Sequence, residues 1–184
     1  MTALVINLLA GPGAGKSTTA AGVFRNLKKM GINAELVPEY AKDLTWESRD
    51  MALDNQIYVL GKQYHRLFRV MDQVEVIITD SPLIFGAIYA PEPYFAHFTP
   101  LVVELFKSMR RMSYFIDRTK PYNPAGRKQT EAEAKEVDRV VHRFLNEHDI
   151  AFKTVPGNDD GEDIITNEVL EVLDFDEIQR MVGV

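Results

Sequence analysis

Nine residues near the N-terminus, 10–18, combine three glycines with a lysine, a serine and a threonine. A bound triphosphate needs many backbone N–H groups pointing into one cavity, and small residues let the backbone wrap that closely. A lysine there would reach the β- and γ-phosphates, and the serine would ligate Mg²⁺. The pattern predicts binding of ATP with Mg²⁺. The expected nucleotide-binding residues are Gly11, Pro12, Gly13, Ala14, Gly15, Lys16, Ser17 and Thr18.

The flanking residues supply the elements that must hold this loop. An apolar run at residues 4–9 precedes it, and a helix-prone stretch, 18–30, follows. Strand, glycine-rich loop, Lys-Ser and helix in this order are typical of the phosphate-binding loop of P-loop NTPases. The usual first glycine of that motif is Ala10 here. A glycine-rich turn that binds nothing is the alternative, and the flanking elements argue against it.

Apolar runs alternate with amphipathic stretches along the whole chain, which predicts a parallel sheet covered by helices. Strands are expected at residues 3–9, 33–38, 74–79, 113–116 and 151–155. Helices are expected at residues 16–30, 48–72, 130–147 and 162–173, with Gly31 ending the first and Thr130 and Glu133 forming a capping box. The predicted class is α/β: a three-layer P-loop NTPase fold with a five-stranded parallel sheet, helices on both faces and a lid loop. Residues 1–184 are expected to form one domain.

Ligands of such sheets bind at the carboxyl ends of the strands, so the residues after each strand are informative. Asp80 follows the apolar run 74–79 and is expected to hold Mg²⁺ with Ser17, usually through water. The alternative role for Asp80 is to cap a helix before Pro82, which Ser81 could also do.

A possible acceptor site follows the second strand. Glu39 would lie across the cleft from the γ-phosphate and could orient or deprotonate an acceptor hydroxyl. Gln56 could read the edge of a base, because an amide is both donor and acceptor, although a surface role explains it equally well. The residues expected to contact the acceptor are Glu39, Tyr40, Gln56 and Ser81.

A basic loop with two prolines and a glycine follows the fourth strand, at about residues 118–129. It predicts a lid that closes over ATP and neutralises charge on the transferred phosphoryl group. Arg118 and Arg127 are its expected catalytic pair, acting with Lys16 and Glu39. The alternative is a solvated basic loop.

Charge and composition restrict the partners. Residues 107–128 hold seven lysines and arginines against Asp117 alone, in a chain with a net charge of −6. This local excess indicates a bound polyanion, for which ATP would suffice and DNA is an alternative. The absence of cysteine, of a signal peptide and of an apolar run near the ~20 residues of a membrane helix predicts a cytoplasmic protein without a membrane partner.

The order of the segments AGPGAGKST, VPEYAKDL, NQIYVLGKQYHRL, IITDSPL and RTKPYNPAGR, over roughly residues 3–158, resembles small P-loop kinases. It looks most like phage-encoded proteins akin to the kinase domain of nicotinamide riboside kinases, and is similar in plan to deoxynucleoside and thymidylate kinases. The resemblance implies Glu39 as the base, Gln56 on the acceptor base, and lid arginines on the phosphates. The chain departs from these enzymes in having Ser81 where they have arginine.

The expected activity is transfer of the ATP γ-phosphate to a nucleoside, a nucleotide or a related acceptor. Two alternatives remain. One is a kinase acting on 5-hydroxymethyluracil in phage DNA, which the resemblance to phage proteins implies and which would place the protein in the host cytoplasm. The other is an ATPase with water as acceptor. A GTP switch is disfavoured, because the chain lacks an Asn-Lys-x-Asp motif and has Ser-Pro-Leu after Asp80.

Overall fold

Five parallel strands form the centre of the molecule. A computed structural model describes residues 2–123 and 130–182. The strands are β1 Leu4–Leu9, β2 Ala34–Val37, β3 Val76–Thr79, β4 Arg111–Asp117 and β5 Lys153–Pro156. They lie in the order β2-β3-β1-β4-β5, and every neighbouring pair is parallel. The predicted five-stranded parallel sheet is confirmed.

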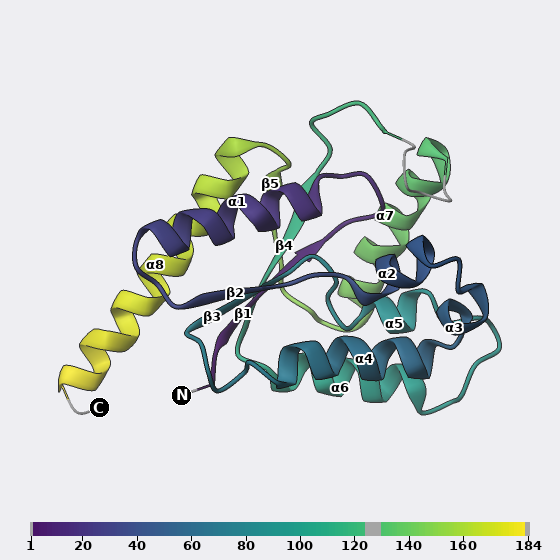
Figure 1. Cartoon of the computed structure of the whole chain (residues 1–184), viewed down its shortest axis with the longest axis horizontal. Coiled ribbons are helices and arrows are strands. Elements are labelled where there is room, and N and C mark those ends of the chain that lie inside the picture. The colour runs from purple at the N-terminus through teal and green to yellow at the C-terminus, as the bar shows by residue number, and fades with distance from the viewer. Residues whose placement is uncertain (1, 124–129, 183–184) are drawn as a thin grey trace.

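Helices cover both faces of this sheet, as Figure 1 shows. They are α1 Lys16–Lys29, α2 Tyr40–Trp46, α3 Asp50–Asp54, α4 Gln56–Phe68, α5 Phe85–Ile88, α6 Phe98–Ser108, α7 Glu131–Glu147 and α8 Asp159–Val182. Helices α1 and α8 pack together on one face, while α4 and α6 lie on the other (Figure 1). Within the described ranges, no helix is both long and apolar enough to cross a bilayer.

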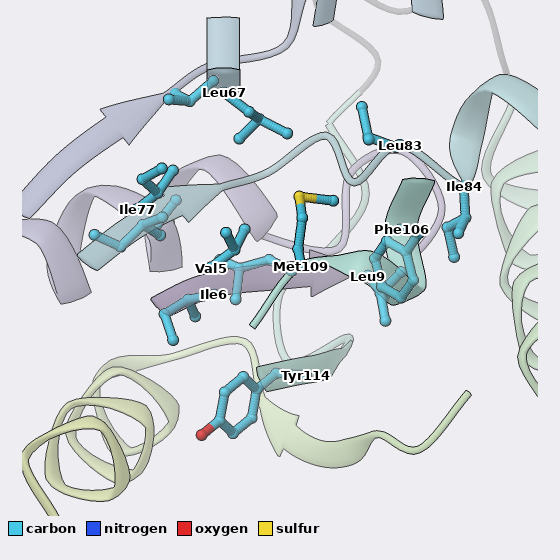
Figure 2. Packing of buried hydrophobic residues seen from close by; sticks show 14 of the residues in the cluster. Val5, Ile6, Leu9, Leu67, Ile77, Leu83, Ile84, Phe106, Met109 and Tyr114 are labelled. Carbon is cyan, nitrogen blue, oxygen red and sulfur yellow. The ribbon is translucent and has the colours of Figure 1, made fainter. Parts of the chain in front are cut away.

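The central strand β1 explains the three-layer arrangement. All six of its residues are buried, as expected for a parallel strand covered on both faces. Figure 2 shows Val5 and Leu9 on the side of Phe106, whereas the Tyr114 ring lies on the other side of the sheet. The Tyr114 hydroxyl donates a hydrogen bond of 2.8 Å to Glu168 of α8, so each face of the sheet holds its own helical layer.

Two local sequence signals set helix ends as predicted. Gly31 has a φ of 84°, a left-handed conformation that glycine adopts without strain, directly after the cap of α1. At the start of α7, the Glu133 N–H donates to the Thr130 hydroxyl (3.3 Å) and the Thr130 N–H donates to the Glu133 carboxylate (2.7 Å). This is the predicted capping box.

The expected single helix over residues 48–72 is wrong. Two helices, α3 and α4, replace it, because Asn55 leaves the helical conformation and its side chain accepts a hydrogen bond from the Tyr58 N–H (3.2 Å). An asparagine that caps a new helix in this way satisfies an otherwise free backbone donor. The short helix α2, directly after Glu39, was not predicted, and α8 extends beyond the expected 162–173 as one continuous helix.

Candidate active site

The loop between β1 and α1 forms one wall of a cavity of about 640 Å³. Gly13 and Gly15 have φ values of 78° and 106°, which side chains other than glycine rarely adopt. Of the expected nucleotide-binding residues, six line this cavity: Pro12, Gly13, Gly15, Lys16, Ser17 and Thr18. The other two do not, because Ala14 is buried and the Gly11 N–H donates to the Asp138 carboxylate (2.5 Å).

The side chain of Lys16 supplies the positive charge on this wall of the cavity. Its ammonium donates hydrogen bonds to the carbonyl oxygens of Ala10 (2.8 Å) and Gly11 (3.0 Å). Burial lowers the pKa of Lys16, and the nearby carboxylates of Glu39 and Asp80 act in the opposite direction. A phosphate oxygen would therefore compete for the ammonium with two neutral carbonyl groups of the loop.

Ser17 and Asp80 form the second element of the site. The Ser17 hydroxyl, in the first turn of α1, donates to Oδ2 of Asp80 (2.5 Å), which follows β3. Oδ1 of Asp80 is buried and has no hydrogen-bond partner among the described residues. A hydroxyl beside a carboxylate with a free oxygen is a donor set that suits Mg²⁺. The described residues contain no group of three or more histidine, cysteine or acidic side chains that could hold a metal, so phosphate and water would have to complete this coordination.

Glu39 also lines the cavity and lies immediately before α2. It occupies the N-cap position, but its side chain makes no capping hydrogen bond and lines the cavity instead. Burial raises the pKa of Glu39, and the charge of Lys16 opposes that rise. The structure thus places a carboxylate of raised proton affinity in the same cavity as Lys16 and Asp80.

The rest of the cavity wall includes two further residues that the sequence predicts for an acceptor site, Gln56 and Ser81. The Gln56 amide donates to the Leu53 carbonyl (2.9 Å). Tyr40 does not line the cavity, because its hydroxyl meets that of Tyr58 (2.7 Å) on the other side of α2. Several wall residues were not predicted: Trp46, Leu53, Val59, Leu60, Leu83 and Tyr89.

Arg118 lies beside the phosphate loop and outside the residues that line the cavity. Its guanidinium donates to Asp138 (2.6 Å) and to the carbonyl oxygens of Pro12 (2.8 Å) and Ala134 (3.2 Å). Asp138 was missed by sequence reasoning, although it is an acidic residue at helical spacing from buried Ala134 on α7. Arg127 falls outside the described residues, as does the expected lid from residue 124 to 129.

Gly157 lies directly after β5. A Cβ at this position would lie 2.6 Å from the Ala14 carbonyl oxygen and 2.9 Å from that of Asp117. Its own N–H donates to the Asp117 carbonyl (2.9 Å), and its carbonyl accepts from the Thr119 hydroxyl (2.9 Å). This glycine lets the loops after β4 and β5 pack directly behind the phosphate loop.

Comparison with known proteins agrees with this fold. Residues 5–163 match a family described as "AAA domain", and no curated protein sequence matches the chain. A solved structure of the NadR protein in complex with NR is similar with a TM-score of 0.66 at 20% identity, over 84% of this chain and 45% of that one. This chain thus spans less than half of the NadR protein.

Two further solved structures match over nearly their whole length. Thymidylate kinase from Ehrlichia chaffeensis has a TM-score of 0.61 at 14% identity, over 94% of this chain and 100% of that one. Shikimate kinase from Aquifex aeolicus has a TM-score of 0.52 at 17% identity, over 95% of this chain and 98% of that one. At these identities the likeness concerns the fold. The chain belongs to the AAA domain family and has the fold of a small P-loop kinase.

Proposed function

We propose that the protein is an ATP- and Mg²⁺-dependent phosphotransferase that moves the γ-phosphate to a nucleoside, a nucleotide or a related acceptor. The observation that carries this proposal is one cavity lined by Lys16, by the Ser17–Asp80 pair and by Glu39. A purely nucleotide-binding loop would not need a second wall with a carboxylate and space for another ligand. We treat residues 1–184 as one kinase-like domain with a lid at about residues 118–129.

Each side chain has a distinct role in the proposed reaction. The acceptor oxygen bonds to the γ-phosphorus, the bond from that phosphorus to the leaving ADP oxygen breaks, and Glu39 takes the acceptor proton. Lys16 neutralises charge on the transferred group. Ser17 and Asp80 would hold Mg²⁺, which supplies further charge neutralisation when bound. Most of the rate enhancement would come from positioning and electrostatics.

The charges of the cavity favour an acceptor hydroxyl over an acceptor phosphate. Among the described residues that line it, the cations are Lys16 and Lys42, and the acidic residues are Glu39, Asp54 and Asp80. Lys16 is committed to the ATP phosphates, so a phosphorylated acceptor would have Lys42 as its only cation among these residues. A neutral acceptor such as a nucleoside avoids this charge repulsion.

A transfer assay with γ-labelled ATP and Mg²⁺ tests the proposal. The acceptor panel holds nucleosides, deoxynucleoside monophosphates, nicotinamide riboside, and DNA with and without 5-hydroxymethyluracil. Label on a nucleoside that requires Lys16 would support the proposal, with Lys16→Ala as the inactive control. Label on DNA would support the DNA-kinase alternative, and label released only as free phosphate would refute phosphotransfer in favour of an ATPase.

Binding can be followed without turnover, because the single tryptophan of the chain is Trp46, a wall residue of the cavity that is 68% exposed. An acceptor that covers this indole should shift its fluorescence to shorter wavelength. We expect the shift for compounds that become labelled, and no shift for panel members that do not.

A further inference from the structure

A second hollow lies on the outer side of α2 and α4, apart from the cavity. It measures about 510 Å³ and is lined by Val37, Pro38, Tyr40, Asp43, Lys62, His65, Arg66 and Arg69. Its lining includes three basic side chains that carry a positive charge, those of Lys62, Arg66 and Arg69. Asp43 is the one acidic residue among the described residues that line it. In an acidic chain with a net charge of −6, this hollow is a local basic surface. We call it the α2–α4 groove.

The cations of the groove fall into two groups. Arg66 is fully engaged, because its guanidinium pairs with Asp43, donates to the Pro38 carbonyl (3.2 Å) and lies 5.0 Å from the centre of the Tyr40 ring. These contacts attach α2 to α4. Arg66 therefore has a structural role that explains its presence without any ligand.

Lys62 and Arg69 have no such structural role. Both are exposed, and neither has an ion-pair partner within the part of the chain that the structure describes. The Lys62 ammonium lies over the Tyr58 ring at 5.6 Å, which restrains it while leaving its charge uncompensated. Exposed His65 lies between these two cations in the sequence. The groove thus holds two cations whose charge is available to an external anion.

The arrangement is linear. Lys62 and Arg66 on α4 and Arg69 at its C-cap follow one another at i, i+4 and i+7, which spans about 10 Å along the helix axis. A strand of duplex DNA places a phosphate about every 3.4 Å along the helix axis, and an unstacked single strand spaces its phosphates more widely, so this length corresponds to about two or three phosphates. A free phosphate or mononucleotide would occupy only part of the groove. The imidazole of exposed His65, beside these cations, suits the face of an unpaired base.

We propose that the α2–α4 groove binds single-stranded nucleic acid through its phosphate backbone. The groove adjoins the acceptor cavity, because α2 separates them: Ala41 and Lys42 line the cavity, whereas Tyr40 and Asp43 line the groove. Binding in the groove requires neither ATP nor phosphotransfer. The proposal therefore does not depend on the proposed enzymatic activity.

The test measures binding of a fluorescent oligonucleotide of about 15 deoxythymidines as a function of salt. The variant K62Q/R69Q removes the two available cations and leaves Arg66 in place. The matched control K28Q/K29Q removes the same charge from the exposed last turn of α1, outside both hollows. Unchanged circular dichroism of both variants would show that the comparison concerns binding.

The slope of log K against log salt is negative, and each lost phosphate contact reduces its magnitude by about 0.7 for a single strand. We therefore expect the magnitude to be smaller by about 1.4 in K62Q/R69Q. If the two proteins bind equally at about 1 M salt, this slope gives about 25-fold weaker binding at about 0.1 M. K28Q/K29Q and Lys16→Ala should bind like the wild type. Retained binding by Lys16→Ala would show that the oligonucleotide is not simply occupying the phosphate loop.

Several results would overturn the proposal. These are absence of salt-dependent binding by the wild type, wild-type affinity of K62Q/R69Q, or an equal loss in K28Q/K29Q. Inorganic polyphosphate of similar length serves as a competitor. If it displaced the oligonucleotide at equal phosphate concentration, the groove would bind polyanions in general and the assignment to nucleic acid would be wrong.

Discussion

Replacement of Glu39 by glutamine should slow catalysis while leaving the fold intact. The carboxylate has no hydrogen-bond partner among the described residues, and it lines the acceptor cavity. A general base contributes about 10²- to 10⁴-fold to a rate. Phosphoryl transfer through a loose transition state needs little assistance from a base, which favours the low end. We therefore expect kcat to fall about 100-fold, or about 3 kcal/mol of transition-state stabilisation.

The same substitution should change the pH dependence of both activity and stability. Burial raises the pKa of Glu39 above its ordinary value of 4.5, and a base must be unprotonated, so kcat of the wild type falls as the pH drops below the raised pKa. Between the ordinary pKa, which holds in the unfolded state, and the raised pKa of the folded state, the folded state binds more protons than the unfolded state. Stability therefore declines as pH rises through that window. Above the raised pKa, the buried charge of Glu39 destabilises the folded state. Glu39→Gln removes that charge, so its Tm should equal or exceed that of the wild type.

The assay is the kcat–pH profile with the labelled acceptor, together with thermal unfolding near pH 8. Glu147→Gln is the matched control, because Glu147 is exposed at the end of α7 and does not line the cavity. A kcat of Glu39→Gln within about threefold of the wild type, with the acidic limb retained, would refute the role as base. A lower Tm would show that the carboxylate stabilises the fold.

Three further substitutions test other parts of the site, and a fourth tests helix α4. Asp80→Asn should raise the Mg²⁺ concentration for half-maximal activity about 10- to 100-fold, measured by metal titration. Trp46→Ala should raise the acceptor KM about 10-fold through loss of about 1 to 3 kcal/mol of stacking, with little change in Tm because the side chain is 68% exposed. Gly157→Ala should destabilise the fold by about 1 to 3 kcal/mol in urea unfolding, because its Cβ would overlap the Ala14 carbonyl. By contrast, Gly61→Ala should stabilise α4 by about 0.5 to 1 kcal/mol, because a Cβ there meets no atom within 4 Å.

Local sequence patterns were sufficient to predict the central sheet and several helix ends. The apolar run of β1, the capping box of Thr130 and Glu133, and Gly31 each act through neighbours in the sequence, and all three were found where expected. The same holds for Lys16 and Ser17, whose spacing from the glycines fixes their place on the loop. The carboxyl-end rule for parallel sheets then brought Glu39 and Asp80 to this cavity.

The positions of α2 and α3 depended on contacts that sequence spacing does not reveal. The Tyr40 N–H donates to the Gln63 side chain (2.9 Å), and Arg66 pairs with Asp43, so α4 fixes the start of α2. Each of these contacts joins residues more than twenty positions apart. The apolar periodicity over 48–72 favoured one helix. The local signal against it was Asn55, whose side chain caps a new helix at that point.

Arg118 shows how the same limitation affects the site. Its place after β4 was predicted, but its partners were not, because Asp138 lies 127 positions from Gly11 and reaches it only after α7 has packed beside the phosphate loop. A Cβ on Gly11 would lie 2.3 Å from the Ala134 carbonyl, so this packing requires a glycine at position 11. Gly11 therefore has a packing role in addition to the expected role in phosphate binding.

The resulting charge balance has a consequence for the nucleotide. Three carboxylates, those of Glu39, Asp80 and Asp138, act on the buried Lys16 ammonium. A triphosphate that entered without a metal ion would add several negative charges to a site that already has more carboxylates than ammonium groups. Mg²⁺ at Ser17 and Asp80 would offset part of that charge where burial makes it most costly. On the proposed function, these charges would favour the magnesium complex of the nucleotide over the free nucleotide as the species that binds.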